Sequence, residues 1–431
     1  MTTPLERLYE IFLQHPIIST DSRKITPGCI FFALKGERFD GSRFAAQALE
    51  SGASAVVTDD PSAGGDPRRI VVEDPLAALQ QLASRHRAQF NIPVIAITGT
   101  NGKTTTKELI AAVLSKRFTC IATEGNLNNH IGVPLTLFRI TKETGIAVIE
   151  MGANHPGEID GLCQLAKPGF GLITNIGKAH LEGFGGYEGV IRAKSELYKY
   201  IGDHGQTLFV NLDDELLSSL SDGMQRINYS RVNPSCYQAE PVSSDPFVEL
   251  DLIGTTEKTR IRSQLVGDYN FYNILAAACI GNFFGVPAGM IRDAVEAYIP
   301  SNNRSQLVRG KRNTVVMDAY NANPSSMAAA LRHFAKSSYP AKMVILGDML
   351  ELGEESETEH RAIIRLVGEL GFSDALYVGP VFRSLLAGSD TPAFRDSQEA
   401  QAYLDERKIS GRTILVKGSR GIHLERVEEV L

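Results

Sequence analysis

The fold is decided by residues 92–106, whose sequence is IPVIAITGTNGKTTT. Its first half is apolar and rich in β-branched side chains, as in a buried strand, and it stops at a glycine turn. A helical pattern follows at residues 108–114. A buried strand, a tight turn and a helix N-terminus form a cradle for phosphate, because backbone N–H groups and the helix dipole then face the anion. The stretch therefore predicts a nucleotide phosphate loop.

Each residue of this loop has an expected role. Gly99 and Gly102 let the backbone approach the phosphate oxygens, Lys103 adds a cation, and the Thr104 hydroxyl is placed to bind Mg²⁺. Ile97 stands where the usual loop has its first glycine, so the loop is a shortened variant. An ordinary glycine-rich strand-to-helix turn is the alternative, which the Lys-Thr pair disfavours. The expected phosphate-binding residues are Gly99, Thr100, Asn101, Gly102, Lys103, Thr104 and Thr105.

Composition limits the class of protein. A chain of 431 residues is long for one core, so two or three domains are expected. A net charge of −6 argues against nucleic acid as the main partner. Five scattered cysteines without a Cys-x-x-Cys pair indicate reduced thiols in a cytoplasmic protein. No apolar run approaches the roughly 20 residues of a membrane span.

The pattern of apolar runs divides this α/β chain into three domains. Residues 1–91 form a small α/β unit. Residues 92–300 alternate strands and helices, which predicts a mostly parallel sheet, with a small antiparallel addition at 226–266. Residues 301–431 form a second doubly wound, Rossmann-like fold, with its site expected at the carboxyl ends of the strands. A hinge is expected near residues 300–303.

Four polar residues outside the loop are candidates for metal or nucleotide binding. Glu150 ends an apolar strand, so it is expected to face the same crevice as the loop, although it could also cap a helix. His180 follows the next strand, where a lone histidine is otherwise a surface residue. Lys194 lies on a helix and could belong to a solvated face. Asn273 could cap a helix or touch a nucleotide base.

The third region carries two dense polar clusters. Residues 318–327 end a strand and open a helix, with more polar groups than helix capping requires. Residues 417–420, after the last strand, supply cations and N–H donors that suit a carboxylate or a phosphate.

Together these motifs resemble the Mur ligase family, the ATP-dependent amide-forming enzymes of bacterial cell-wall precursor synthesis. The resemblance covers essentially the whole chain, and the loop variant at 99–105 is similar to the nucleotide signature of that family. Residues 125–134, 150–159 and 318–327 look most like members that add D-alanyl-D-alanine to a UDP-N-acetylmuramoyl tripeptide. The resemblance implies an acyl-phosphate intermediate made with ATP.

The resemblance also implies roles for individual residues. Catalytic roles fall to Lys103, Lys194 and His180, and Mg²⁺, expected as two ions, would be held by Thr104, Glu150, His180 and Lys194. Lys194 matches a lysine that many members carry as a carbamate. The nucleotide would also contact Asn273, Arg304 and Asp318. The substrates would contact Ser22, Arg23, Asn126, Asn128, Asn129, Asn321, Asn323, Ser325, Lys417, Ser419 and Arg420.

Several alternatives are weighed against this reading. The Mur ligase that adds the third amino acid, in the preceding step of the pathway, has an Asp-Asn-Pro-Arg type signature that this chain lacks. Folylpolyglutamate synthase is also disfavoured, because it lacks a uridine-binding first domain, which residues 1–91 resemble. A regulatory P-loop ATPase or kinase is disfavoured, because it would not need two further α/β domains with polar residues at their strand ends. A non-catalytic binding protein is disfavoured, because it would not need the complete set of expected metal ligands. The reading implies UDP-N-acetylmuramoyl tripeptide and D-alanyl-D-alanine as substrates, and a monomer.

Overall fold

The structure is a computed structural model that describes residues 4–36, 39–61, 65–254, 258–301 and 303–431. The chain divides into two compact units. The first unit comprises the described residues up to Ala96 with Thr119–Gly152 and Glu158–Gly169, and the second comprises Ile97–Phe118, Ala153–Gly157 and Phe170–Leu431. The expected hinge at 300–303 includes residue 302, which lies outside the described residues.

The N-terminal part of the first unit contains a small parallel sheet of order β1-β2-β5-β6. All residues of β2 and β5 are buried, because parallel strands are covered on both faces. Helical spacing predicts helices at 4–14 and 75–90, and apolar runs predict strands at 29–34 and 55–58. The structure has a helix or a strand in each stretch, although the second helix ends at Arg87. The elements are α1 (Pro4–Gln14), β1 (Ile18–Ser19), η1 (Ser22–Lys24), β2 (Ile30–Phe32), β3 (Lys35–Gly36), β4 (Phe39–Asp40), η2 (Gly41–Phe44), α2 (Ala45–Glu50), β5 (Ala55–Thr58), β6 (Arg69–Val71) and α3 (Pro75–Arg87).

One expectation in this part needs correction. The aspartates, prolines and glycines of residues 59–69 predict a loop, but β6 begins at Arg69, at the end of that segment. Its pairing with β5 along Val56–Thr58 makes it a strand. Residues 62–64 of the expected loop lie outside the described residues.

The rest of the first unit carries the strand that ends in Glu150. Every residue of β9 (Ile146–Glu150) is buried, and β9 pairs in parallel with β8 (Cys120–Ala122). The two helices of this part are α5 (Gly132–Leu137) and α6 (Glu158–Ala166). β7 (Val94–Thr98) begins in the first unit and passes into the second at Ile97.

The second unit begins with the phosphate loop and α4 (Lys103–Leu114), followed by strands in the order β15-β14-β13-β12-β11-β10. The addition expected at 226–266 is antiparallel only in part, because β12 pairs in parallel with both β11 and β13. The elements are β10 (Phe170–Ile173), α7 (Leu181–Phe184), α8 (Tyr187–Asp203), β11 (Thr207–Asn211), α9 (Glu215–Leu220), β12 (Arg226–Ser230), β13 (Tyr237–Ser243), β14 (Glu249–Ile253), β15 (Lys258–Arg262), α10 (Asn270–Phe283) and α11 (Ala288–Ala297).

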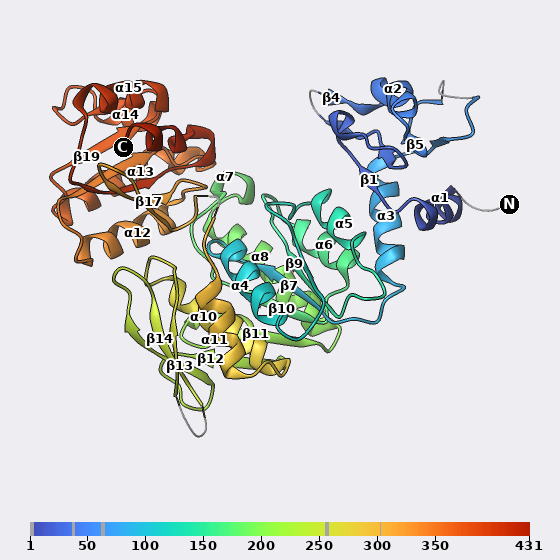
Figure 1. The fold of residues 1–431 in the computed structure, drawn as a ribbon, viewed down its shortest axis with the longest axis horizontal. Coiled ribbons are helices and arrows are strands. Elements are labelled where there is room, and N and C mark those ends of the chain that lie inside the picture. The colour runs from blue at the N-terminus through green and yellow to red at the C-terminus, as the bar shows by residue number, and fades with distance from the viewer. Residues whose placement is uncertain (1–3, 37–38, 62–64, 255–257, 302) are drawn as a thin grey trace. The chain divides into compact units, whose positions relative to one another are not determined.

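The C-terminal part of the second unit is a six-stranded sheet of order β16-β17-β21-β18-β19-β20, parallel except for β16. α15 and α12 lie on opposite sides of β17 in Figure 1. The elements are β16 (Gln306–Arg309), β17 (Thr314–Asp318), α12 (Pro324–Lys336), β18 (Lys342–Gly347), η4 (Gly353–Glu355), α13 (Ser356–Glu369), β19 (Ala375–Val378), α14 (Pro380–Leu385), β20 (Ala393–Phe394), α15 (Ser397–Arg407), β21 (Thr413–Lys417), η5 (Arg420–Ile422) and η6 (Leu424–Val430).

The register of this sheet positions the C-terminal polar clusters. Asp318, the last residue of β17, is paired with Lys417, the last residue of β21. The two polar segments therefore leave the same edge of the sheet side by side. Within the described part of the chain, no helix combines the length and apolarity needed to cross a bilayer.

Candidate active site

The phosphate loop joins the end of β7 to the start of α4, and its two glycines are sterically required. Gly99 has a φ of +139° and Gly102 a φ of +78°, where side chains other than glycine are strained. A Cβ on Gly99 would lie 2.1 Å from the Thr174 hydroxyl, and one on Gly102 would lie 2.7 Å from Asn273 Oδ1. Thr174 and Asn273 therefore lie so close to the shortened loop that only glycine fits at positions 99 and 102.

Hydrogen bonds hold the loop in this shape. The Thr174 hydroxyl and Asn175 Nδ2 both donate to the carbonyl of Asn101, at 2.6 and 3.0 Å. The Asn101 N–H donates to Asn175 Oδ1 at 3.0 Å. Thr100 exchanges hydrogen bonds with the backbone of Gly177 through its hydroxyl. The loop is thus anchored to the segment that follows β10.

The N-terminus of α4 presents the expected cation and hydroxyl. Lys103 Nζ donates to the carbonyls of Gly99 and Thr100, at 2.7 and 3.0 Å, so its ammonium group lies against the loop. Thr104 is buried, with 4% of its surface exposed. A positive helix terminus beside a lysine is suited to bind the phosphates of a nucleotide.

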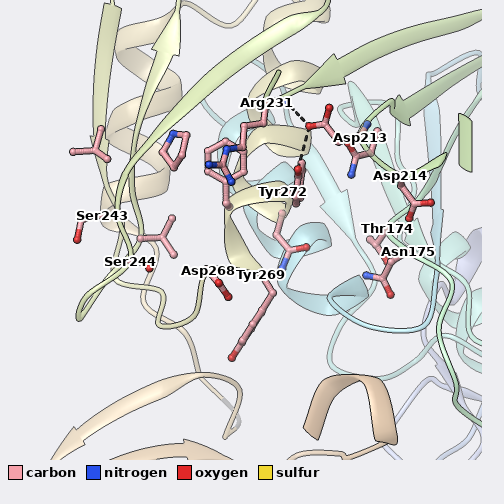
Figure 2. A pocket seen from close by; sticks show the side chains of 16 residues that line it. Thr174, Asn175, Asp213, Asp214, Arg231, Ser243, Ser244, Asp268, Tyr269 and Tyr272 are labelled. Carbon is pink, nitrogen blue, oxygen red and sulfur yellow. Dashed lines mark hydrogen bonds between the residues drawn. The ribbon is translucent and has the colours of Figure 1, made fainter. Parts of the chain in front are cut away.

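A cavity of about 820 Å³ extends beside the loop and is lined mainly by polar residues (Figure 2). Asn273 lies between the two, because a Cβ on Gly102 would lie 2.7 Å from its Oδ1 and its side chain also lines the cavity. Its Oδ1 accepts from Thr106 of α4 at 3.0 Å. Figure 2 shows Asp213 between Arg231 and Tyr272, and its Oδ2 accepts from the backbone of Arg231 at 2.6 Å and from the Tyr272 hydroxyl at 3.1 Å. Burial raises the pKa of Tyr272 to about 12, and the charge of Asp213 adds to the shift.

The structure brings His180 and Lys194 close to the same aromatic ring. His180 has a φ of +51° and precedes α7, and its ring lies 6.4 Å from that of Phe184. Lys194 Nζ lies 5.3 Å from the Phe184 ring centroid, and the lysine is 2% exposed. Glu351 pairs with His180 Nδ1, and this hydrogen bond holds the pKa of Glu351 below its usual value.

The remaining candidate metal ligand, Glu150, belongs to the first unit. It is 1% exposed, its Oε1 accepts from Asn128 Nδ2 at 2.8 Å, and its N–H donates to Thr123. Of the other predicted asparagines, Asn126 is exposed, and Asn129 Oδ1 accepts from the backbone N–H groups of Ile131 and Gly132 at the start of α5. The structure therefore joins Asn128 to Glu150, and leaves Asn126 and Asn129 on the surface.

Two further substrate candidates lie in the N-terminal part of the first unit. Ser22 and Arg23 belong to η1, whose N-cap is Asp21. Arg23 forms an ion pair with Asp21 at 2.9 Å, and its side chain is 86% exposed. An exposed guanidinium on a 3₁₀ turn is available to bind an anion.

The C-terminal candidates gather where β17 and β21 end. Lys417 Nζ forms an ion pair with Asp318 Oδ2 at 2.6 Å, and the N–H of Ser305 donates to Asp318 Oδ1 at 3.2 Å. The Ser419 hydroxyl donates to the Ala322 carbonyl at 3.2 Å. Asn321 is exposed, and Arg304 and Arg420 both lie near the ring of Tyr320.

Side chains of the C-terminal part also reach the phosphate loop. Asn323 Nδ2 donates to Asn101 Oδ1 at 2.8 Å. The N–H of Lys178 donates to the Ser325 hydroxyl at 3.1 Å, and Lys178 Nζ pairs with Glu359 at 2.6 Å. The structure thus uses Asn323 and Ser325 to hold the loop region, a role that the sequence did not suggest.

Sequence reasoning also missed several residues of the site. Glu351, Glu359 and Tyr320 were not predicted, because their partners lie far away in the sequence. Asp213 and Asp214 follow β11 after one residue, so an acidic pair near a strand end was a signal that could have found the cavity. Among the described residues, no group of three or more His, Cys, Asp or Glu side chains is arranged to hold a metal ion.

Three protein-family models match successive stretches of the chain. Residues 16–87 match the family described as "Mur ligase family, catalytic domain", residues 97–281 the "Mur ligase middle domain", and residues 303–420 the "Mur ligase, glutamate ligase domain". These matches support the expected three-domain α/β fold class. The boundaries proposed at 91/92 and 300/301 stay a prediction.

Individual relatives are similar over nearly their whole length. The UDP-N-acetylmuramoyl-tripeptide--D-alanyl-D-alanine ligases of Bacillus subtilis and Escherichia coli are 34% and 35% identical to this chain. These alignments cover 95% and 96% of this chain, and 92% and 93% of the relatives.

Solved structures of such ligases have the same fold. The crystal structure of MurF from Acinetobacter baumannii matches with a TM-score of 0.87 at 33% identity, over 96% of this chain and 92% of that one. MurF ligase from Thermotoga maritima in complex with ADP matches with a TM-score of 0.84 at 25% identity, over 100% and 98%. This chain therefore belongs to the Mur ligase family.

Proposed function

We propose that this protein is an ATP-dependent ligase that joins D-alanyl-D-alanine to UDP-N-acetylmuramoyl tripeptide in peptidoglycan precursor synthesis. The observation that carries the proposal is the phosphate loop, which is held by Thr174 and Asn175 and opens beside the polar cavity. A preformed loop of this kind suits phosphoryl transfer. The substrates follow from the relatives named above, whose alignments cover 95% and 96% of this chain.

The chemistry follows from the poor reactivity of a carboxylate toward an amine. An oxygen of the tripeptide carboxylate attacks the γ-phosphorus of ATP, ADP leaves, and an acyl phosphate forms. The neutral amine of the dipeptide then attacks the acyl carbon and loses a proton to solvent, and the tetrahedral adduct expels phosphate to leave the amide. Lys103 and the N-terminus of α4 stabilise the negative charge on the phosphoryl group during transfer.

We propose that Thr104, Glu150 and His180 hold Mg²⁺. The hydroxyl and the carboxylate are oxygen donors of the kind that Mg²⁺ prefers, and both side chains are buried. Protein sites for this ion are often completed by substrate phosphates, which agrees with the absence of a three-residue His, Cys, Asp and Glu cluster among the described residues. The ion would neutralise charge on the phosphates.

We propose that Lys194 carries a carbamate, which would supply an oxygen ligand for a second Mg²⁺. Its position supports this, because Lys194 Nζ and the proposed ligand His180 both lie beside the ring of Phe184. Lys194→Ala is expected to lose turnover and to recover part of it with added short carboxylates such as acetate. Full activity of this variant without additives would contradict the proposal.

Contacts with the nucleotide and substrates are proposed as follows. Asn273, Arg304 and Asp318 would contact the nucleoside and phosphates, since Asn273 joins the loop to the cavity. The uridine-nucleotide and muramoyl peptide would contact Ser22, Arg23, Asn126, Asn128 and Asn129. The peptide carboxylate or the incoming dipeptide would contact Asn321, Asn323, Ser325, Lys417, Ser419 and Arg420.

The deciding experiment is a phosphate-release assay with purified protein. Release is expected only when ATP, UDP-N-acetylmuramoyl tripeptide and D-alanyl-D-alanine are all present, with a muramoyl pentapeptide as the product by mass spectrometry. Release with the dipeptide replaced by a single amino acid, or in the absence of any amine, would contradict the proposal.

The five cysteines, all free, support a reducing cytoplasm as the location of the protein. Sedimentation would test the expected monomer.

A further inference from the structure

Three separate segments meet at the carboxyl end of the C-terminal sheet. β17 and β21 end side by side, with Asp318 opposite Lys417. β16 runs antiparallel to β17, with Gln306 opposite Met317, so the residues before β16 lie level with those after β17. The N–H of Tyr320 accordingly donates to the carbonyl of Asn303 at 3.2 Å. Tyr320 is therefore fixed by its backbone at the point where the segments converge.

The ring of Tyr320 contacts two guanidinium groups. Arg304, from the segment before β16, places its Cζ 3.6 Å from the ring centroid. Arg420, from η5 after β21, places its Cζ 5.2 Å from the same centroid, and its Nη1 donates to the Tyr320 hydroxyl at 3.3 Å. One side chain thus holds two cations that lie 116 residues apart in the chain by their numbers, 420 and 304.

Within the described part of the chain, these two cations have no carboxylate partner. Among the ion pairs formed by the described residues, none includes Arg304 or Arg420, whereas the neighbouring Lys417 is paired with Asp318. Arg304 Nε is also buried without a hydrogen-bond partner. Two like charges at one ring repel each other, and an oxyanion bound to both would remove that repulsion.

We propose that Tyr320 is a positioning residue that holds Arg304 and Arg420 together as one binding site for an oxyanion of the reactants. The site takes either a phosphoryl group of ATP or the carboxylate of the dipeptide, because each presents two oxygens on one atom to the guanidinium N–H groups. The inference rests on the proposed function and deepens it, since it makes one aromatic ring the support for both arginines.

The test compares Tyr320→Leu, which removes the ring, with Tyr320→Phe, which removes only the hydroxyl. Dissociation constants are measured by calorimetry for a non-hydrolysable ATP analogue, and for D-alanyl-D-alanine added to protein that carries the analogue. KM and kcat come from phosphate release. Tyr320→Leu is expected to weaken binding of one ligand, with a matching rise in its KM, by about tenfold. Tyr320→Phe is expected to stay within about threefold of wild type, because the stack on Arg304 remains.

The identity of the weakened ligand distinguishes the two anions. A loss confined to the ATP analogue assigns a phosphoryl group, and a loss confined to the dipeptide assigns its carboxylate. Tyr403→Leu is the matched control, because it removes a similar stack with Arg407, at 4.4 Å, on α15. Wild-type affinity of Tyr320→Leu for both ligands, or an equal loss in Tyr403→Leu, would overturn the inference. A wild-type protein that releases no phosphate would instead overturn the proposed function, and the calorimetry would still test the arginine pair.

Discussion

Replacement of Gly99 by alanine tests whether the shape of the phosphate loop is needed for nucleotide binding. The new Cβ would lie 2.1 Å from the Thr174 hydroxyl and 3.0 Å from the Thr174 backbone nitrogen. Both atoms would have to move, and the hydroxyl would lose its hydrogen bond to the Asn101 carbonyl. The residue would also keep a φ of +139°, which alanine rarely adopts.

The size of the effect follows from these two terms. Backbone strain of this kind costs about 1–3 kcal/mol, and a lost hydrogen bond about 1 kcal/mol. Retaining the loop shape would therefore cost about 2–4 kcal/mol, which corresponds to roughly 30-fold to 1,000-fold weaker nucleotide binding. Titration calorimetry with an ATP analogue measures the affinity, and urea unfolding measures the stability of the same variant.

Two control variants separate the clash with the Thr174 hydroxyl from the backbone strain of alanine at a positive φ. Gly205→Ala has a positive φ of +63° with nothing within 4 Å of its Cβ, so it is expected to lose some stability and no nucleotide affinity. The double variant Gly99→Ala/Thr174→Ala removes the hydroxyl that collides, and is expected to bind better than Gly99→Ala alone. Wild-type affinity of Gly99→Ala, or no gain in the double variant, would refute the steric explanation.

Three further predictions concern charged groups. Lys103→Ala should remain folded by circular dichroism and release no phosphate, and wild-type turnover would remove Lys103 from the site. Lys178→Glu and Glu359→Lys should each lower kcat severalfold by opposing like charges across a pair now at 2.6 Å, and the double exchange should restore it; an inactive double variant would reject the ion pair as the cause. Burial lowers the pKa of His86 below its ordinary 6.5, so below that pH the unfolded chain binds the proton more readily and the free energy of unfolding should fall. Urea unfolding at about pH 5.5 and 7.5 should show a smaller fall for His86→Gln, and an equal fall would exclude this histidine.

The phosphate loop could be predicted from the sequence because its signals are local. The apolar run of β7, the glycines and the helical pattern of α4 lie within about 20 consecutive residues, and each favours the same structure. β16 and β6 were missed for the opposite reason. Each is short, and each becomes a strand through pairing with a neighbour, β17 or β5.

The candidate site shows the same division between local and long-range information. Residues at strand ends, such as Asp318 and Lys417, could be proposed because parallel strands bring their carboxyl ends together. Glu351 and Tyr320 could not, because their contacts with His180 and Arg304 depend on how the elements pack. Nothing in the sequence near Glu351 distinguishes it from the other acidic residues around it.

Asn323 performs two tasks with the two ends of one amide. Its Oδ1 accepts from the N–H of Ser326 at 2.9 Å and so starts α12, while its Nδ2 donates to Asn101 at 2.8 Å. Aspartate, serine and threonine also start helices well, yet aspartate has no hydrogen to offer and the two hydroxyls are too short to serve both partners. The side-chain amide of Asn323 thereby joins the first turn of α12 to the phosphate loop at Asn101. A rotation of the N-terminal end of α12 would therefore displace the loop.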